Sequence, residues 1–424
     1  MRKKFFFLTA LVWTAAAVLG LTSAALAQVK LVRHMAPEAV PLYEEAARLF
    51  TEKTGIEVEL IAAPGAQLAK WEQVITMIAG GISPDIVDAI SMEFGQYAAR
   101  GLIQSFDKFL ERDPIDRSLV NTQLLDPLTW QGEQYVIPYG ASGLTLVYNP
   151  GHFQEAGVAA PPSQWNDPGW TWDVFVDTAR KLTRREADGR VSRFGLGGNL
   201  GGWIDLGYHF GADWVSPDLT RWTGSDDEMV EALIRYQDLP WRDHVSPQPG
   251  EDGSFANQRS SMTMMGTWSI PAYVQYPFDW SFIPWPEAPP NPPVGVIYPV
   301  GMTLLSTAPN EAEAWELVKF LATDPEANYL WATAAGAVPM VLADIPRWAF
   351  ELEEQRSGVN AIVFGEQVRA HGAVARVRKL STFGEMNEIA TRVLDEIMQQ
   401  NKPVRLAMEE IAEQMQALVS QAIP

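Results

Sequence analysis

The sequence predicts an α/β protein of two large domains, each with a mainly parallel sheet flanked by helices. At 424 residues the chain exceeds what one hydrophobic core normally organises. Its hydrophobic fraction of 47% and charged fraction of 20% are typical of globular domains. Short apolar runs alternate with segments of helical period, which indicates βαβ units.

The N-terminal stretch is predicted to be a secretory signal peptide rather than part of the fold. A basic segment, Arg2-Lys3-Lys4, precedes the apolar run 5–21, and Ala25-Leu26-Ala27 has the small residues of a cleavage site. A membrane anchor is the alternative, but the apolar run is barely long enough to span a bilayer. We therefore expect cleavage after Ala27.

Charge and cysteine content restrict the possible partners. Removal of residues 1–27 takes away three cations and lowers the net charge from −20 to −23. Such a chain repels phosphate backbones and anionic lipid, so nucleic acid and membrane surfaces are not expected partners. The absence of cysteine excludes disulfides, thiolate metal sites and a lipid-modified cysteine. These features predict a free periplasmic protein.

The first part of the chain alternates strands and helices. An apolar run of helical period ends at Gly55, a residue that commonly terminates helices. The expected elements are a strand at 30–33, a helix at 37–54, a strand at 56–61, a helix at 68–79 and a strand at 83–87.

The remainder of the chain continues this alternation. A buried strand at 144–148 ends at Asn149-Pro150-Gly151, and Ser225–Glu228 reads as a capping box that starts a helix. The other expected elements are a helix at 172–182, a strand at 300–305, a helix at 310–321, a further helix capped at Asp324, and two amphipathic helices in 383–419, broken at 401–403.

Motifs for catalysis and cofactors are missing from the sequence. The five histidines are scattered without metal-ligand spacing, and no G-x-S-x-G occurs. The glycine-rich stretch 194–203, FGLGGNLGGW, has neither phosphate-loop nor dinucleotide spacing. We therefore expect no catalytic residues, no metal and no cofactor. A carboxylate pair of a secreted glycoside-acting enzyme remains the alternative from another functional class.

Four motifs in order carry a resemblance to a known family. The sequence resembles the family 1 extracellular solute-binding proteins of sugar-type ABC importers, the maltose-binding-protein-like set. The matching stretches are G-G-I-S-P-D-I-V with F-G-Q-Y-A-A-R-G (80–101), the segment 134–182 with Y-x-x-P-Y-G and L-x-Y-N-P, the segment 255–268 ending in G-x-W, and the G-x-x-P of 336–339.

The resemblance implies a two-lobed periplasmic-binding-protein fold of type II, with the ligand held between the lobes. The N-terminal lobe would comprise residues 28–142 and 298–337, and the C-terminal lobe residues 143–297 and 338–424. Hinge closure would trap a carbohydrate, in particular an oligosaccharide. The protein, which we expect to be a monomer, would deliver it to an ABC permease. A glycerol phosphodiester, which needs cations, or a polyamine, which needs carboxylates around aromatics, stays open as the ligand.

Candidate ligand contacts follow from the chemistry of sugars and from the family motifs. Pyranose C–H faces stack on aromatic rings, and hydroxyl groups need paired donors and acceptors. Trp268, in G-x-W, is the foremost candidate. Ser142 stands where maltose-type members carry an acidic residue, so the sugar itself is left open. The remaining candidates are Tyr139 beside Ser142, Met92 and Glu93 after P-D-I-V, and Trp203, His34, Trp285, Tyr298 and Phe383.

Overall fold

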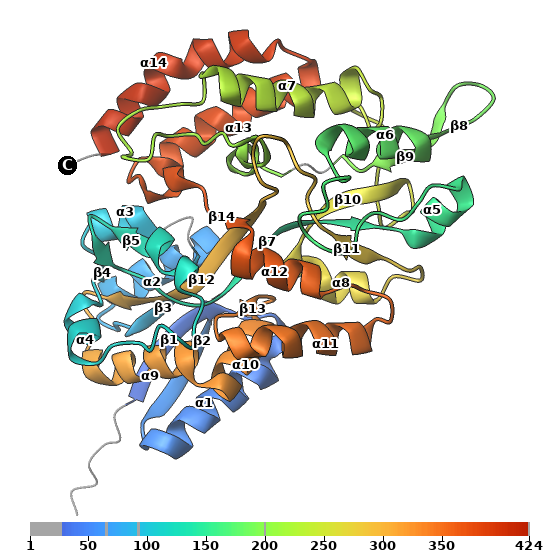
Figure 1. Ribbon diagram of the computed structural model, residues 1–424. Coiled ribbons are helices and arrows are strands. Elements are labelled where there is room, and N and C mark those ends of the chain that lie inside the picture. Colours follow the sequence, from blue (N-terminus) through green and yellow to red (C-terminus); the bar gives the residue numbers. More distant parts are fainter. Residues whose placement is uncertain (1–27, 64–66, 91–93, 199–200, 423–424) are drawn as a thin grey trace, which may run out of the picture.

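Two long strands, β7 (Ile137–Tyr148) and β12 (Gly295–Leu305), run antiparallel through the middle of the molecule. The computed structural model describes residues 28–63, 67–90, 94–198 and 201–422 (Figure 1). The predicted signal peptide and the candidates Met92 and Glu93 lie outside these ranges. In Figure 1, one group of elements lies below the two strands and another lies above them; we call these the first half and the second half.

The first half is a sheet of order β2-β1-β3-β12-β7 covered by helices on both faces. Its strands are β1 (Gln28–His34), β2 (Glu57–Ala63), β3 (Ile86–Ile90) and β4 (Ile103–Gln104), with the small hairpin β5 (Thr129–Trp130) and β6 (Glu133–Gln134). Its helices are α1 (Val40–Thr54), α2 (Gln67–Ala79), α3 (Phe94–Ala99), α4 (Asp107–Arg112), α9 (Glu311–Thr323) and α10 (Pro325–Ala334).

The second half extends from the other end of β7 in the order β7-β10-β9-β8. Its strands are β8 (Arg184–Arg185), β9 (Val191–Leu196), β10 (Ser260–Gly266) and β11 (Ser281–Ile283), the last paired with β7. Its helices are α5 (Pro150–Ala156), α6 (Trp172–Leu182), α7 (Asp227–Trp241), α13 (Phe383–Gln400) and α14 (Val404–Ala422). Figure 1 shows α7, α13 and α14 together at the far end of this half.

A third group packs beside the shared strands. It consists of α8 (Ile270–Val274), α11 (Ile345–Gln355) and α12 (Ile362–Ala370), with β13 (Val338–Pro339) against β7 and β14 (Gly372–Ala373) against β12. Its core includes Ala141 and Val147 of β7 and Phe364 of α12. These elements therefore cover the region where the two halves join.

The shared strands divide their side chains between the two halves. Ile137 and Tyr139 of β7 belong to a core of the first half, whereas Leu144 and Leu146 belong to the core of the second. Each strand therefore leaves one half and enters the other without an intervening loop. Among the described residues, no helix combines the length and hydropathy that crossing a membrane requires.

Most expected elements are present, with two corrections. The helix at 172–182 occurs at its expected bounds, because Thr171 caps the Val174 N–H and the apolar residues face the core. The pairs β1–β2, β1–β3 and β9–β10 are parallel as expected, but β8 pairs antiparallel with β9, and β7 and β12 pair antiparallel, since the chain crosses between the halves and returns. The capping box at 225–228 is wrong: α7 begins after Asp226, which makes no side-chain capping bond.

Candidate functional site

An exposed tryptophan stands where β10 ends beside the shared strands. Trp268 lies in a short 3-10 turn (Thr267–Ser269) that follows β10, and 52% of its surface is exposed. The Thr267 hydroxyl accepts a hydrogen bond from the Gly143 N–H of β7 at 3.2 Å, which fixes the turn to the crossing strand. The indole is therefore presented to solvent from a rigid support.

Glycine at two positions makes room for this tryptophan. A Cβ built on Gly266 would lie 2.1 Å from the Trp268 ring, so only glycine lets the indole fold back over the end of β10. A Cβ on Gly336, whose φ is +66°, would lie 3.2 Å from the Trp268 Cα. The glycines of G-x-W and G-x-x-P, remote in sequence, thus both border one side chain.

A buried polar cluster lies next to Trp268. The rings of Trp268 and Tyr298 are 5.7 Å apart, and the Tyr298 hydroxyl donates to the Asp205 carboxylate at 2.6 Å. The Arg378 Nη2 lies 3.6 Å from the same carboxylate, and its guanidinium sits over the Tyr298 ring at 4.4 Å. We call Asp205, Tyr298 and Arg378 the second cluster, because it lies on the side of the second half; a first cluster, in the first half, is described below.

The second cluster holds opposite charges in a nearly dry environment. Arg378 is 2% exposed and Asp205 is buried as well. Burial raises the pKa of Asp205, although Arg378, the Tyr298 hydroxyl and the Gly202 N–H all favour the ionised form. Burial also raises the pKa of Tyr298, so this hydroxyl remains a hydrogen-bond donor at neutral pH.

A similar trio is enclosed in the first half, and we call it the first cluster: Arg33, Asp88 and Tyr139. The Tyr139 hydroxyl donates to Asp88 at 2.8 Å, and the Arg33 Nη2 lies 3.9 Å from the other carboxylate oxygen. Arg33 is 3% exposed and its guanidinium lies between the rings of Tyr43 (3.6 Å) and Trp331 (4.7 Å). The predicted ligand contact Tyr139 is therefore in this sealed cluster.

Three of the predicted contacts meet at one place. Ser142 pairs with Tyr298 across β7 and β12, and Tyr298 contacts Trp268. Ser142 itself is buried. His34, in contrast, lies exposed at the end of β1 with its ring nitrogen 3.4 Å from the Ala63 carbonyl.

The other predicted aromatics lie in the core of the second half. Trp203 is buried, donates to the Asn387 side chain at 2.9 Å and stacks on Phe383. Trp285 is buried against the His209 ring at 3.9 Å, and burial lowers the pKa of His209 to about 3. All three aromatics are packed among core residues in this structure.

Asp205 was not predicted as a site residue from the sequence. Arg376 and Arg378 were candidates there for binding a hydroxyl or a phosphate group, with a solvated surface position as the favoured interpretation. The one available signal for Asp205 is its position after the glycine-rich loop, where it accepts from the Gly202 N–H at 2.8 Å. Arg378 precedes α13 beside Arg376, which is indeed exposed. Neighbouring arginines in sequence thus have opposite environments.

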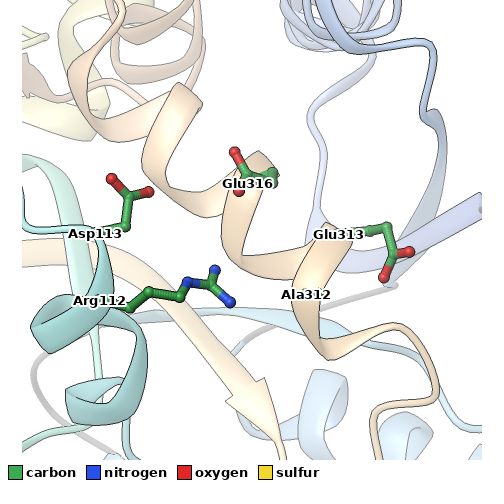
Figure 2. A pocket seen from close by; sticks show the side chains of 5 residues that line it. All are labelled: Arg112, Asp113, Ala312, Glu313 and Glu316. Carbon is green, nitrogen blue, oxygen red and sulfur yellow. The ribbon is translucent and has the colours of Figure 1, made fainter.

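A hollow of about 530 Å³ lies elsewhere, on the first half between α4 and α9 (Figure 2). Figure 2 shows Arg112 reaching from α4 toward α9, while Glu313 points away from it. The lining residues, Arg112, Asp113, Ala312, Glu313 and Glu316, include no aromatic platform. No group of three or more potential metal ligands occurs within the described ranges.

Comparison with known proteins identifies relatives over most of the chain. The sequence model of the bacterial extracellular solute-binding proteins matches residues 36–328. The maltotriose-binding protein of Pyrococcus abyssi is 21% identical over 279 residues, 62% of this chain and 56% of that protein. A putative binding protein of Brucella abortus is 25% identical over 163 residues, 37% of this chain and 39% of its own length. The chain thus spans less than two thirds of these curated relatives.

Solved structures share the fold over nearly the entire chain. The cyclic alpha-maltosyl-1,6-maltose binding protein from Arthrobacter globiformis superposes with a TM-score of 0.77 at 16% identity, covering 93% of this chain and 100% of that one. UgpB from Mycobacterium tuberculosis, in complex with glycerophosphocholine, gives 0.76 at 17% identity, with 94% and 99% covered. The expected two-lobed periplasmic-binding-protein fold is confirmed.

Proposed function

Because the chain belongs to the bacterial extracellular solute-binding proteins, we propose that it binds a carbohydrate between two lobes and delivers it to an ABC permease. The lobes comprise residues 28–142 with 298–337, and residues 143–297 with 338–424. The ligand is an oligosaccharide, and the protein acts in the periplasm as a monomer without catalysing a reaction. The family description, extracellular solute binding, supports the location and the non-enzymatic role.

The exposed indole of Trp268 carries this proposal. A half-exposed tryptophan on a rigid turn, beside the Tyr298 ring, offers an apolar platform for the C–H face of a pyranose. Among the other large exposed apolar side chains of the described residues, Phe350 is the one aromatic ring, and it lies on the surface of α11. Trp268 also stands beside the strands that join the halves, where a ligand can touch both.

The charge balance of the second cluster favours a neutral ligand over a charged one. The Arg378 cation lies beside the Asp205 carboxylate, so neither presents an uncompensated charge. A phosphodiester would need a cation available to its phosphate, and a polyamine would need several carboxylates around the aromatic ring. The relatives that bind maltotriose and a cyclic maltose saccharide support the same ligand class.

Movement of the lobes follows from the shared strands. Both β7 and β12 continue from one half into the other, so bending within these strands alters the angle between the halves while each core stays intact. A ligand that contacts both halves binds one arrangement better and shifts the population toward it.

A thermal-shift panel on residues 28–424 tests the proposal. Oligosaccharides, glycerophosphodiesters and polyamines are added to the wild type, to Trp268→Ala and to the matched control Phe350→Ala. Phe350 is 59% exposed in the wild type. A ligand at about 100 times its dissociation constant adds about 2.7 kcal/mol of stability. We expect a carbohydrate to raise the melting temperature, and Trp268→Ala to weaken its binding by about 2 kcal/mol, roughly 30-fold.

The control should bind like the wild type. Unchanged carbohydrate affinity in Trp268→Ala would show that Trp268 is not the stacking platform of the site. If only a glycerophosphodiester or a polyamine raised the melting temperature, the family assignment would stand and the proposed ligand class would be wrong.

A further inference from the structure

A short 3-10 turn, η8 (Arg376–Lys379), leads into α13 and is anchored in the second half. Val377 is fully buried in the core of that half, and Arg378 pairs with Asp205. The Arg376 Nε lies 3.2 Å from the Asp213 carboxylate. Three successive side chains therefore fix this turn to the second half.

The next residue binds the first half. The Lys379 ammonium donates to the Asp126 carbonyl at 2.8 Å and to the Thr129 hydroxyl at 3.1 Å. Asp126 begins another 3-10 turn, η3 (Asp126–Leu128), and Leu128 is fully buried in a core of the first half. Lys379 thus makes a polar link between the halves that lies outside the shared strands.

The link is short and its surroundings are tight. Consecutive Cα atoms are about 3.8 Å apart, so Arg378 and Lys379 hold different halves across a single peptide unit. The backbone of Lys379 also packs on α3: a Cβ built on Gly95 would lie 3.0 Å from the Lys379 carbonyl oxygen. Partial burial lowers the pKa of Lys379, as expected for an ammonium group that is partly removed from water at the contact between the halves.

We propose that η8 is a clamp whose Lys379 link stabilises the arrangement of the two halves seen here against arrangements in which they are rotated relative to each other. The clamp sets the conformational equilibrium through contacts remote in sequence from Trp268. Loss of two hydrogen bonds from a charged donor changes the ratio of arrangements on the order of tenfold. The inference concerns the ligand-free chain and does not depend on which ligand the site binds.

Spin labels can measure this equilibrium directly, because the chain has no cysteine of its own. Glu44→Cys on α1 and Glu231→Cys on α7 place one exposed label on each half. Electron–electron double resonance on the ligand-free protein then gives the distribution of distances between the halves. The distribution is recorded for three versions of the double-labelled protein: with Lys379 intact, with Lys379→Met, and with Lys181→Met. The last is a control that removes an exposed lysine of α6.

We expect Lys379→Met to shift or broaden the distance distribution, and Lys181→Met to leave it unchanged. Thr129→Val removes one of the two acceptors and should give an intermediate change. Gly95→Ala, which crowds the Lys379 carbonyl from the other side, should displace the distribution without altering any charge. Superimposable distributions for Lys379→Met and the wild type, with both proteins folded by circular dichroism, would overturn the clamp.

Discussion

The first and second clusters contain the same three residue types in different surroundings. In each, a tyrosine hydroxyl donates to a buried aspartate that an arginine faces at less than 4 Å. The Arg33 guanidinium is enclosed between the Tyr43 and Trp331 rings. Arg378 covers the Tyr298 ring, which in turn contacts the exposed Trp268.

The difference between the clusters shows what makes such a trio available to a ligand. Burial of the arginine, the aspartate and the tyrosine is similar in both, so these three residues alone do not separate structure from binding. The distinguishing feature is a fourth residue, the tryptophan whose ring reaches solvent. We therefore expect the first cluster to act on stability, and the second to act on both stability and ligand affinity.

The largest expected effect comes from Arg33→Met. This change removes the guanidinium that faces the buried Asp88 carboxylate, while the Lys70 ammonium, which donates to the Asp88 backbone carbonyl, remains. We expect the free energy of unfolding to fall by about 3 kcal/mol, the lower end of the range for breaking a buried ion pair. Denaturant unfolding followed by circular dichroism measures the loss, with Arg117→Met, an exposed arginine of the same half, as control. A loss below about 1 kcal/mol would mean that the first cluster contributes little to stability.

A matched pair of tyrosine variants separates the two clusters. Tyr139→Phe and Tyr298→Phe each remove one hydrogen bond to a buried carboxylate, and each should lower the free energy of unfolding by about 1.5–3 kcal/mol. Titration calorimetry with the carbohydrate identified in the panel should show weakened binding only for Tyr298→Phe. Equal weakening in both variants would contradict the assignment of binding to the second cluster alone.

Mild acid should destabilise the protein through His209 of the second half, with an effect of about 2 kcal/mol between pH 6.5 and pH 5. Burial lowers the pKa of His209 to about 3. Above pH 6.5 the histidine is neutral in both states. As the pH falls below 6.5, the unfolded chain takes up a proton that the folded protein excludes, so stability declines down to about pH 3.

The pH dependence of unfolding in His209→Gln measures this contribution. The variant should lose about 1.4 kcal/mol per pH unit of the wild-type slope in this range. His34→Gln, which alters the exposed histidine at the end of β1, is the matched control. A wild-type slope in His209→Gln would show that this residue is already protonated in the folded state.

The sequence predicts most of the fold because periodicity and capping are local. Trp172–Leu182 has its cap and its apolar face within a single segment, so its bounds could be predicted. The shared strands are longer than expected, beginning at Ile137 and Gly295, since prolines and glycines interrupt their pattern while neighbouring strands supply the pairing. The local sequence pattern therefore does not predict the bounds of a strand where pairing with distant strands determines them.

The site was only partly predictable for the same reason. Trp268 could be singled out through its motif, and its exposure agrees with a platform. Trp203 is equally aromatic and follows a glycine-rich loop, yet Trp214 and Trp222, later in the chain, surround it. Asp205 and Arg378 are remote in sequence and meet through the tertiary packing of η8 and α13 on the second half. The burial and the partners of these side chains depend on residues far away in the sequence, so a short segment of sequence cannot predict them.

The two strands that pass through both halves also make the halves inseparable as cooperative units. If the first half unfolded, β12 would lose its partner β3, and both β7 and β12 would lose part of their core, so the second half would keep two strands that are only partly paired. Calorimetry should accordingly record one melting transition rather than two. The two halves can therefore change their relative orientation, but they should unfold together in a single cooperative transition.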